Sequence, residues 1–412
     1  MTSDQRFDRF ERSVPLLLEE LGMGPPPDYR DSIVGRTAAM RQRPAWTFPE
    51  RWIPMETVSQ RIPVAPIRWR PVALFLMLGL LIVAALAIGI GSQRHLPAPF
   101  GPARNGLIAY HENGDIFLGD PANGTSRAVV GGPDIDEWPM FSRDGTRVAF
   151  LRRALAAGAS NVVITNADGS GLRQLTRQPL QDVSGADWSA DGRLILIDYS
   201  AGDHAAIGII DVEHGGLTPL DVGMDGFGAV FRPTDDRTIA FTADEDSKSA
   251  IYVVDRTGRP PRRIAWGGGP AYSPDGSRIA YGRTYQPEVE RNETRVVNAD
   301  GSDERLVGDR PDIQYQGTPV WSPDGTQLAV FRNSRTAGLV LAVIPADGSG
   351  PGREFAAGFR HGFGTLGWSP DGTQLVTTPA SEVDQARLIN LADGSIRRVP
   401  RWYAAAWQRL AP

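Results

Sequence analysis

Aspartates in short turn-like segments recur along this chain, and their carboxylates are the groups most able to do chemistry. Six of them share one sequence context: Asp144, Asp191, Asp235, Asp275, Asp324 and Asp371. A calcium loop needs several oxygen ligands at fixed offsets and a later glutamate. No stretch of the chain has the Asp-x-Asp-x-Asp-Gly spacing followed by that glutamate. We therefore interpret the six aspartates as structural turn residues and expect no metal ligand among them.

Other patterns of catalytic residues are also missing from the sequence. The closest approach to the Gly-x-Ser-x-Gly motif of a hydrolase is residues 367–371, where Ser369 belongs to a turn. Gly267–Gly269 lacks the lysine of a phosphate-binding loop, and the chain has no cysteine. The five histidines are scattered, with no His-Glu-x-x-His: His95, His111, His204, His214 and His361. The sequence thus predicts no catalytic residue, no metal and no cofactor.

The segment around each aspartate belongs to a longer repeat. Trp321-Ser322-Pro323-Asp324-Gly325 is a full copy, and its leading aromatic recurs at positions 141, 188, 231, 272, 321 and 368, which is a spacing of 41 to 49 residues. Pro, Asp and Gly favour a tight turn, and an apolar strand follows each copy. Four short strands per repeat at this period predict a β-propeller, which is an all-β fold.

The two ends of the repeat array complement each other. Residues 105–130 supply three strands without an opening strand, and residues 402–407 supply an opening strand with nothing after it. Trp407 stands where the next repeat aromatic is due after Trp368. Pairing the two ends completes one blade and leaves no open sheet edge. We therefore expect a seven-bladed propeller over residues 105–412, closed by the N- and C-terminal strands.

The pattern aromatic-Ser-Pro-Asp-Gly-x-x-Ile/Leu-Ala-Phe resembles the TolB-type propeller repeat of bacterial proteins over roughly residues 102–412. The resemblance implies a binding or scaffold module. Some peptidases carry a similar propeller as a gate over a separate hydrolase domain, for which this chain leaves no room. Loops 152–160, 242–249 and 285–295 are further candidates for a binding rim, because binding residues often lie on variable loops.

Residues 71–91, from Pro71 to Gly91, contain no charged side chain and match the length of about 20 residues that a membrane-spanning helix needs. More arginines precede this segment than follow it, which places the N-terminus in the cytoplasm. We expect a single-pass protein of the cell membrane, with a Pro-rich linker at residues 92–104 and an extracytoplasmic propeller.

Residues 1–70 are predicted to be a cytoplasmic segment that is helical in its first part. Phe7, Phe10, Leu17 and Leu21 fall at helical spacing and form a candidate face for a protein partner. Trp46 and Trp52 lie in a proline-rich stretch that docks either on a partner or at the lipid interface. This layout resembles that of membrane-bound anti-sigma factors, which implies a cytoplasmic sigma factor as partner. The Cys/His zinc motif of many such proteins is absent.

Together these features predict a non-catalytic membrane protein, not an enzyme. Its propeller would bind a protein or a small ligand, with a protein partner on the outer face, and would signal to the anti-sigma-like segment. One alternative is an envelope scaffold that passes no signal across the membrane, and another is a hydrolase that uses the propeller as a gate. The net charge of −5 gives no reason to expect nucleic acid as a partner.

Overall fold

The computed structural model describes residues 100–153, 158–285, 291–308, 313–334, 338–355, 363–379, 385–399 and 403–411. Strands and turns make up this part of the chain, and no helix is present in it. The predicted all-β fold is therefore confirmed for the described residues.

The first and last strands of the described chain share one sheet. Its order is β28-β1-β2-β3, and its strands are β28 (Tyr403–Leu410), β1 (Arg104–Glu112), β2 (Asp115–Gly119) and β3 (Ser126–Val130). In the antiparallel pair of β1 and β28, Ile108 stands opposite Trp407. The end-to-end pairing expected from the sequence is thus present.

The next two repeats form one sheet of eight strands, in the order β11-β10-β9-β8-β6-β5-β4 with β7 paired to β6. The strands of the first repeat are β4 (Asp136–Phe141), β5 (Arg147–Arg153), β6 (Ala159–Asn166) and β7 (Arg173–Gln174). Those of the second are β8 (Leu180–Trp188), β9 (Leu194–Ala201), β10 (His204–Asp211) and β11 (Leu217–Leu220). In the described chain, strand pairing joins the two repeats at only two residue pairs, Ala159 with Gln181 and Ser160 with Leu180.

Each of the remaining four repeats forms its own four-stranded sheet, in chain order. The first two contain β12 (Gly226–Phe231), β13 (Thr238–Glu245), β14 (Lys248–Asp255), β15 (Arg262–Trp266), β16 (Gly268–Tyr272), β17 (Arg278–Tyr285), β18 (Arg291–Asn298) and β19 (Arg305–Val307). The last two contain β20 (Ile313–Trp321), β21 (Gln327–Ser334), β22 (Gly338–Pro345), β23 (Arg353–Phe355), β24 (Phe363–Trp368), β25 (Gln374–Pro379), β26 (Ala386–Asn390) and β27 (Ile396–Val399).

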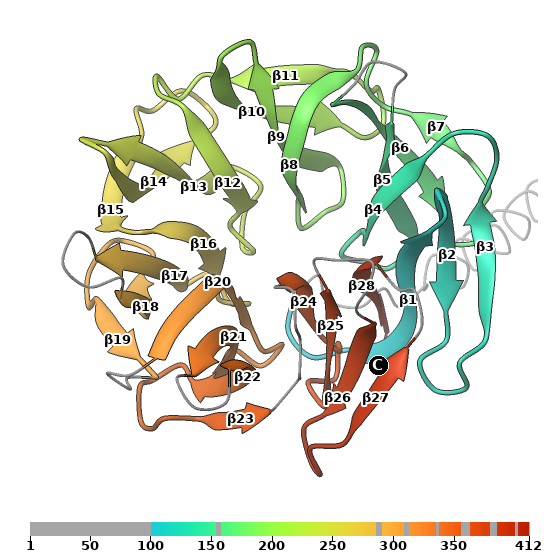
Figure 1. Cartoon of the computed structure of the whole chain (residues 1–412). Coiled ribbons are helices and arrows are strands. Elements are labelled where there is room, and N and C mark those ends of the chain that lie inside the picture. The colour runs from blue at the N-terminus through green and yellow to red at the C-terminus, as the bar shows by residue number, and fades with distance from the viewer. Residues whose placement is uncertain are drawn as a thin grey trace, which may run out of the picture. The chain divides into compact units, whose positions relative to one another are not determined.

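The sheets follow one another around a ring, and the first strand of each repeat lies on the inner side (Figure 1). The core lies between neighbouring repeats. Trp321, for example, packs with Leu328 of its own sheet and with Val296 of the preceding one. Each repeat therefore buries its apolar face only against its neighbours, which is typical of a propeller.

The side of the ring on which the innermost strands end is called here the turn face, and the side on which they begin is called the loop face. Residues 100–103 reach the ring at the turn face. The Ala103 N–H donates to the Pro370 carbonyl at 2.9 Å, and the Arg143 guanidinium lies 4.7 Å from the centre of the Phe100 ring. Pro370 and Arg143 both belong to the turns that end an innermost strand.

The three predicted loops are shorter than the sequence indicates, because residues 152–153, 159–160 and 291–295 belong to β5, β6 and β18. Residues 242–249 belong mostly to β13 and β14, with Glu245 paired to Lys248. Only Asp246 and Ser247 form the turn, both with positive φ, as a tight two-residue hairpin requires. The segment is therefore a hairpin tip and not an open acidic loop.

Candidate functional site

The six aspartates singled out in the sequence lie in the turns at the ends of the innermost strands. At Asp324, the carboxylate accepts hydrogen bonds from the Ser322 hydroxyl at 2.6 Å and from the Thr326 N–H at 3.0 Å. Asp144, Asp191, Asp275 and Asp371 accept equivalent bonds from their own serine. Asp235 lacks that serine and accepts from the Arg237 and Thr238 N–H groups.

The other residues singled out in the sequence lie outside the described residues: Phe7, Phe10, Leu17, Leu21, Trp46, Trp52, Pro71 and Gly91. Among the residues that the structure describes, no helix is long and apolar enough to cross a membrane. Within the same residues, no group of three His, Cys, Asp or Glu side chains could hold a metal ion.

Every innermost strand from β4 to β24 has a shift in its pairing register shortly before its last aromatic residue. In β4, β12 and β16 the residue three places before that aromatic has a positive φ: 56° at Trp138, 64° at Gly228 and 65° at Gly269. Such bulges turn the local backbone and redirect side chains, and they are frequent next to binding sites.

A polar side chain of the preceding repeat holds each of these three bulges. The Trp138 N–H lies 3.4 Å from His111 Nδ1, the Gly228 N–H donates to Asp198 at 2.7 Å, and the Gly269 N–H donates to Thr242 at 3.0 Å. His111, Asp198 and Thr242 occupy equivalent positions, each three residues after the isoleucine that pairs with the repeat aromatic. We call this contact the bulge clasp.

The junction between β4–β7 and β8–β11 departs from this arrangement. Leu151 occupies the position of the clasp side chain, and its side chain cannot form a hydrogen bond with β8. The tryptophans of two other repeats donate to the preceding repeat: Trp321 to the Ala271 carbonyl at 2.8 Å and Trp368 to the Val320 carbonyl at 3.0 Å. The buried Trp188 Nε1 has no hydrogen-bond partner among the described residues. This junction therefore lacks two polar contacts that some other junctions have. Gly282 and Phe331 also leave the clasp position without a polar group, and Trp407 Nε1 also has no partner among the described residues.

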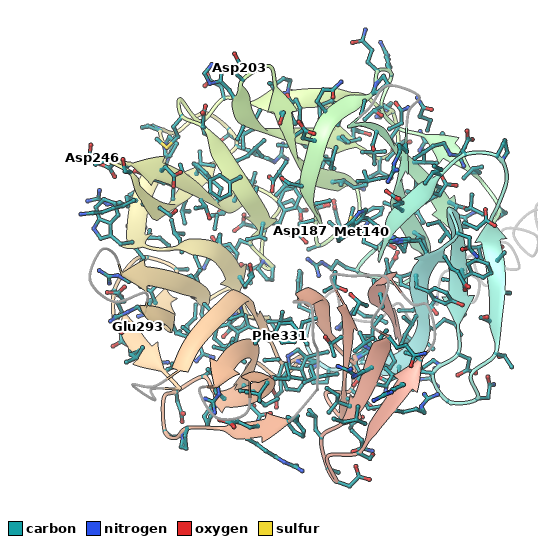
Figure 2. All side chains as sticks on the ribbon, viewed as in Figure 1. Met140, Asp187, Asp203, Asp246, Glu293 and Phe331 are labelled. Carbon is teal, nitrogen blue, oxygen red and sulfur yellow. The ribbon has the colours of Figure 1, made fainter. Side chains whose placement is uncertain are left out.

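A pocket of about 380 Å³ lies at this junction on the inner side of the ring. Its walls come from β4, β5, β6, β8 and β9, and Thr365 and Ala406 from β24 and β28 complete it. Met140 of β4 is one of its lining residues, and Figure 2 shows this residue at the inner side of the ring. The described lining residues are mostly apolar and none is titratable. Such a pocket can hold an apolar group, with the hydroxyls of Ser184 and Thr365 as its polar contacts.

Trp138 is the most exposed large apolar side chain of this pocket. Its side chain is 55% exposed, although its backbone is in the left-handed region that a bulky residue seldom adopts. Strained residues of this kind cluster at binding and active sites.

Two buried carboxylates lie beside this region, at the junction with β12. Asp187, also near the inner side of the ring in Figure 2, pairs with Arg143 and accepts a hydrogen bond from the Phe231 N–H at 2.9 Å. Burial raises the pKa of Asp187 despite these contacts. Burial likewise raises the pKa of Asp198 to about 6, against the hydrogen bonds from Gly228 and Ala229. Both carboxylates accept hydrogen bonds from backbone N–H groups of β12, and so they connect β8–β11 to the next repeat.

Our reading of the sequence did not single out Trp138, Met140 or Asp198. One feature of the sequence could have identified Trp138. Three places before each repeat aromatic, the other repeats have a small residue: Gly185, Gly228, Gly269, Thr318 and Thr365. An alignment of the repeats on their aromatics would therefore have marked Trp138 as an exception.

No protein-family model and no curated protein matches this chain. Solved structures do resemble it. TolB from Acinetobacter baumannii is 16% identical, with 73% of this chain and 81% of that chain covered and a TM-score of 0.50. An oligogalacturonate lyase from Vibrio parahaemolyticus is 17% identical, with 73% and 87% covered and a TM-score of 0.53. A periplasmic gluconolactonase from Pseudomonas aeruginosa is 15% identical, with 74% and 99% covered and a TM-score of 0.54.

Identities this low establish the fold alone. Proteins named as enzymes are among these structures, so the fold is compatible with an enzyme as well as with a binding protein. In fold, the described part of the chain is a β-propeller that is similar to TolB.

Proposed function

We propose that this chain is a membrane-anchored binding protein whose propeller holds an apolar group of a protein partner in the pocket at the β4–β8 junction. The observation that supports this proposal best is the pocket. Its described walls offer apolar contact from Trp138, Met140 and Val183, and they present no titratable group that could act as an acid, a base or a nucleophile.

We also propose that the propeller has seven blades. The eight-stranded sheet counts as two blades in this proposal, β4–β7 and β8–β11, because strand pairing between them involves only two of the described residue pairs. Separate apolar clusters support the division. Trp188, Ile164 and Ile210 pack together between the two halves, as other clusters do between separate sheets.

Photo-crosslinking in intact cells tests the pocket. A benzoyl-phenylalanine at Ser184, which lines the pocket, is expected to form an adduct with one defined protein. Ala406→Phe fills the pocket from β28 and should abolish that adduct, since Ala406 is a wall residue. The adducts are identified by mass spectrometry of the full-length protein.

The matched control places the same crosslinker at Leu172, an exposed apolar residue outside the pocket lining. An adduct at Ser184 that survives Ala406→Phe, or that forms equally at Leu172, would contradict the proposed pocket function. The absence of any adduct at Ser184 would contradict it as well.

The anchor and the cytoplasmic part of the proposal follow from the sequence. We propose that residues 71–91 cross the membrane once and that residues 1–70 hold a sigma factor through the face of Phe7, Phe10, Leu17 and Leu21. Occupation of the propeller pocket outside the membrane would then change the release of that factor. The layout of the segments supports this version over a scaffold that passes no signal.

Deletion of residues 1–70, with the span and the propeller retained, tests the signalling version. Transcription of one defined set of genes should rise, because the sigma factor is no longer held. Transcriptome profiling measures the change, and surface labelling shows that the propeller is still displayed. An unchanged transcriptome with a displayed propeller would favour the scaffold.

A further inference from the structure

We infer that residues 100–103 are a strap that locks the seam of the ring, and that Arg143 and Arg409 hold this strap in place. The seam is the pair of β28 and β1 (Figure 1), in which strands from the two ends of the described chain meet. Every other described sheet consists of strands that follow one another in the sequence. The inference does not depend on the proposed pocket function.

The pairing of strands at the seam is less regular than elsewhere in the ring. The register between β1 and β28 shifts twice, between Asn105 and Ile108 and between Ala109 and His111. Each of the other innermost strands, β4, β8, β12, β16, β20 and β24, has one such shift. A bulge interrupts the row of hydrogen bonds, and separation of β28 from β1 would leave two open sheet edges. Contacts from outside the two strands are therefore valuable at the seam.

The strap makes contacts on both sides of the seam. At one end, the Ala103 N–H donates to the turn that follows β24. In the middle, the Gly101 carbonyl accepts a hydrogen bond from Arg409 of β28 at 2.5 Å. At the other end, the ring of Phe100 lies 4.7 Å from the guanidinium of Arg143, in the turn that follows β4. The strap therefore connects three successive repeats across the seam.

The two arginines that contact the strap are exceptions in the repeat. Arg143 and Arg409 each stand two places after a repeat aromatic. At the same place the other repeats have an uncharged residue: Ala190, Pro233, Pro274, Pro323 and Pro370. Proline suits this turn, so the turn itself does not account for the arginines. They occur in two neighbouring repeats, and the strap contacts both of them.

The charges of the two arginines explain why the strap binds at this place. Burial and the charge of Arg143 lower the pKa of Arg409 to about 10, so the two cations lie near each other. Asp187 pairs with Arg143. The strap adds partial negative charge at both cations, through the Gly101 carbonyl and the face of the Phe100 ring. Loss of the strap would leave two like charges side by side at the seam with less compensation.

Hydrogen–deuterium exchange of the full-length chain in lipid nanodiscs, measured by mass spectrometry, tests the inference. Phe100→Ala removes one contact of the strap and changes neither strand of the seam. Exchange in peptides from β28 and β1 should become about fivefold faster, as expected when a cation–π contact no longer opposes local opening. Exchange in peptides from β13 and β14, in a repeat that the strap does not contact, should stay the same.

Arg232→Ala is the matched control. Arg232 also lies in a turn after an innermost strand, and it donates to the Gly276 carbonyl of the next repeat at 2.9 Å. Its replacement should speed exchange near β12 and β16 and leave β28 unchanged. A rise at β28 as large as that in Phe100→Ala would show that the seam responds to the loss of any turn contact, and the inference would be wrong.

A double variant tests whether the strap acts as one unit. Arg409→Met keeps an apolar stem and removes the donor to Gly101, so it should also speed exchange at the seam. Combined with Phe100→Ala, it should add little to the larger single effect, because both changes release the same strap. Effects that multiply in full would show two independent contacts and would refute the strap.

Two results with Phe100→Ala alone would overturn the inference. One is unchanged exchange in β28 and β1. The other is an equal rise in every peptide, those of β13 and β14 included, because it would assign Phe100 to the stability of the whole ring and not to its seam.

Discussion

Asp198 is only 3% exposed, and its carboxylate forms the bulge clasp with Gly228 and Ala229 of the next repeat. Burial raises its pKa from an ordinary 3.8 to about 6, because a charged group is poorly solvated there. The folded chain thus binds a proton on Asp198 more tightly than the unfolded chain does. The stability from this group is fully present below the ordinary pKa and is lost as the pH rises to about 6.

Asp198→Asn removes this titration and retains an oxygen that can accept from Gly228. Between about pH 4 and about pH 7, the wild type should lose on the order of 2 kcal/mol of unfolding free energy relative to Asp198→Asn. Urea unfolding at several pH values measures the difference. Asp203→Asn, at an exposed hairpin tip, is the control. A wild-type-to-variant difference that does not change with pH would contradict the assigned role.

The turn aspartates respond to pH in the opposite direction. At Asp324, burial raises the pKa, but the hydrogen bonds from Ser322 and Thr326 outweigh it and hold the pKa below its ordinary value. The folded chain therefore favours the charged carboxylate, and the stability from this group is lost as the pH falls through its folded pKa. Acid thus weakens the turns, whereas the same change favours the clasp at Asp198.

At the scale of strands, arginines in the outermost strands connect successive repeats. Each donates to a carbonyl in the turn before the outermost strand of the next repeat. Examples are Arg127 to Ala167 at 2.7 Å, Arg173 to Glu213 at 2.8 Å and Arg262 to Asp300 at 2.8 Å. Arg397 of β27 makes the equivalent bond to Pro121 and so connects the last full repeat to the first sheet. The arginines of the outermost strands therefore hold successive repeats together.

Arg397→Ala should lower the unfolding midpoint by about 2 °C, since one charge-assisted hydrogen bond across the closing junction is lost. Arg398→Ala is the matched control. It changes the same residue type, in the same strand, at a side chain that is also exposed. Thermal unfolding followed by circular dichroism measures both variants. Equal midpoints for the two variants would argue against a role of Arg397 in joining the repeats.

The strand framework could be predicted from the sequence, because local residue chemistry determines it. The repeat aromatics Phe141, Trp188 and Trp321 are each the last residue of an innermost strand, as the turn motif indicates. The pocket could not be predicted in this way. It arises where Leu151 of β5 faces β8 without a polar group and where Met140 and Ala406, distant in sequence, share one wall. Such contacts depend on how the repeats meet around the ring and not on any local pattern.

For the whole molecule, residues 100–103 meet the ring at the turn face. Ala103 is bonded to Pro370 at that face, whereas Asp134 and Asp182 lie at the loop face, where innermost strands begin. If residues 71–91 are an anchor, as proposed, the linker joins the ring at the turn face.

The position of β1 also has a mechanical consequence. The linker continues directly into Arg104, and β1 is hydrogen-bonded along one edge to β2 and along the other to β28. A pull on the linker along β1 therefore loads both rows of bonds in shear, all together and not one after another. The bond from Ala103 to Pro370 passes part of the same force to the neighbouring sheet. If residues 71–91 anchor the chain, as proposed, an attachment of this kind resists tension, and the ring can remain folded when a bound partner pulls on it.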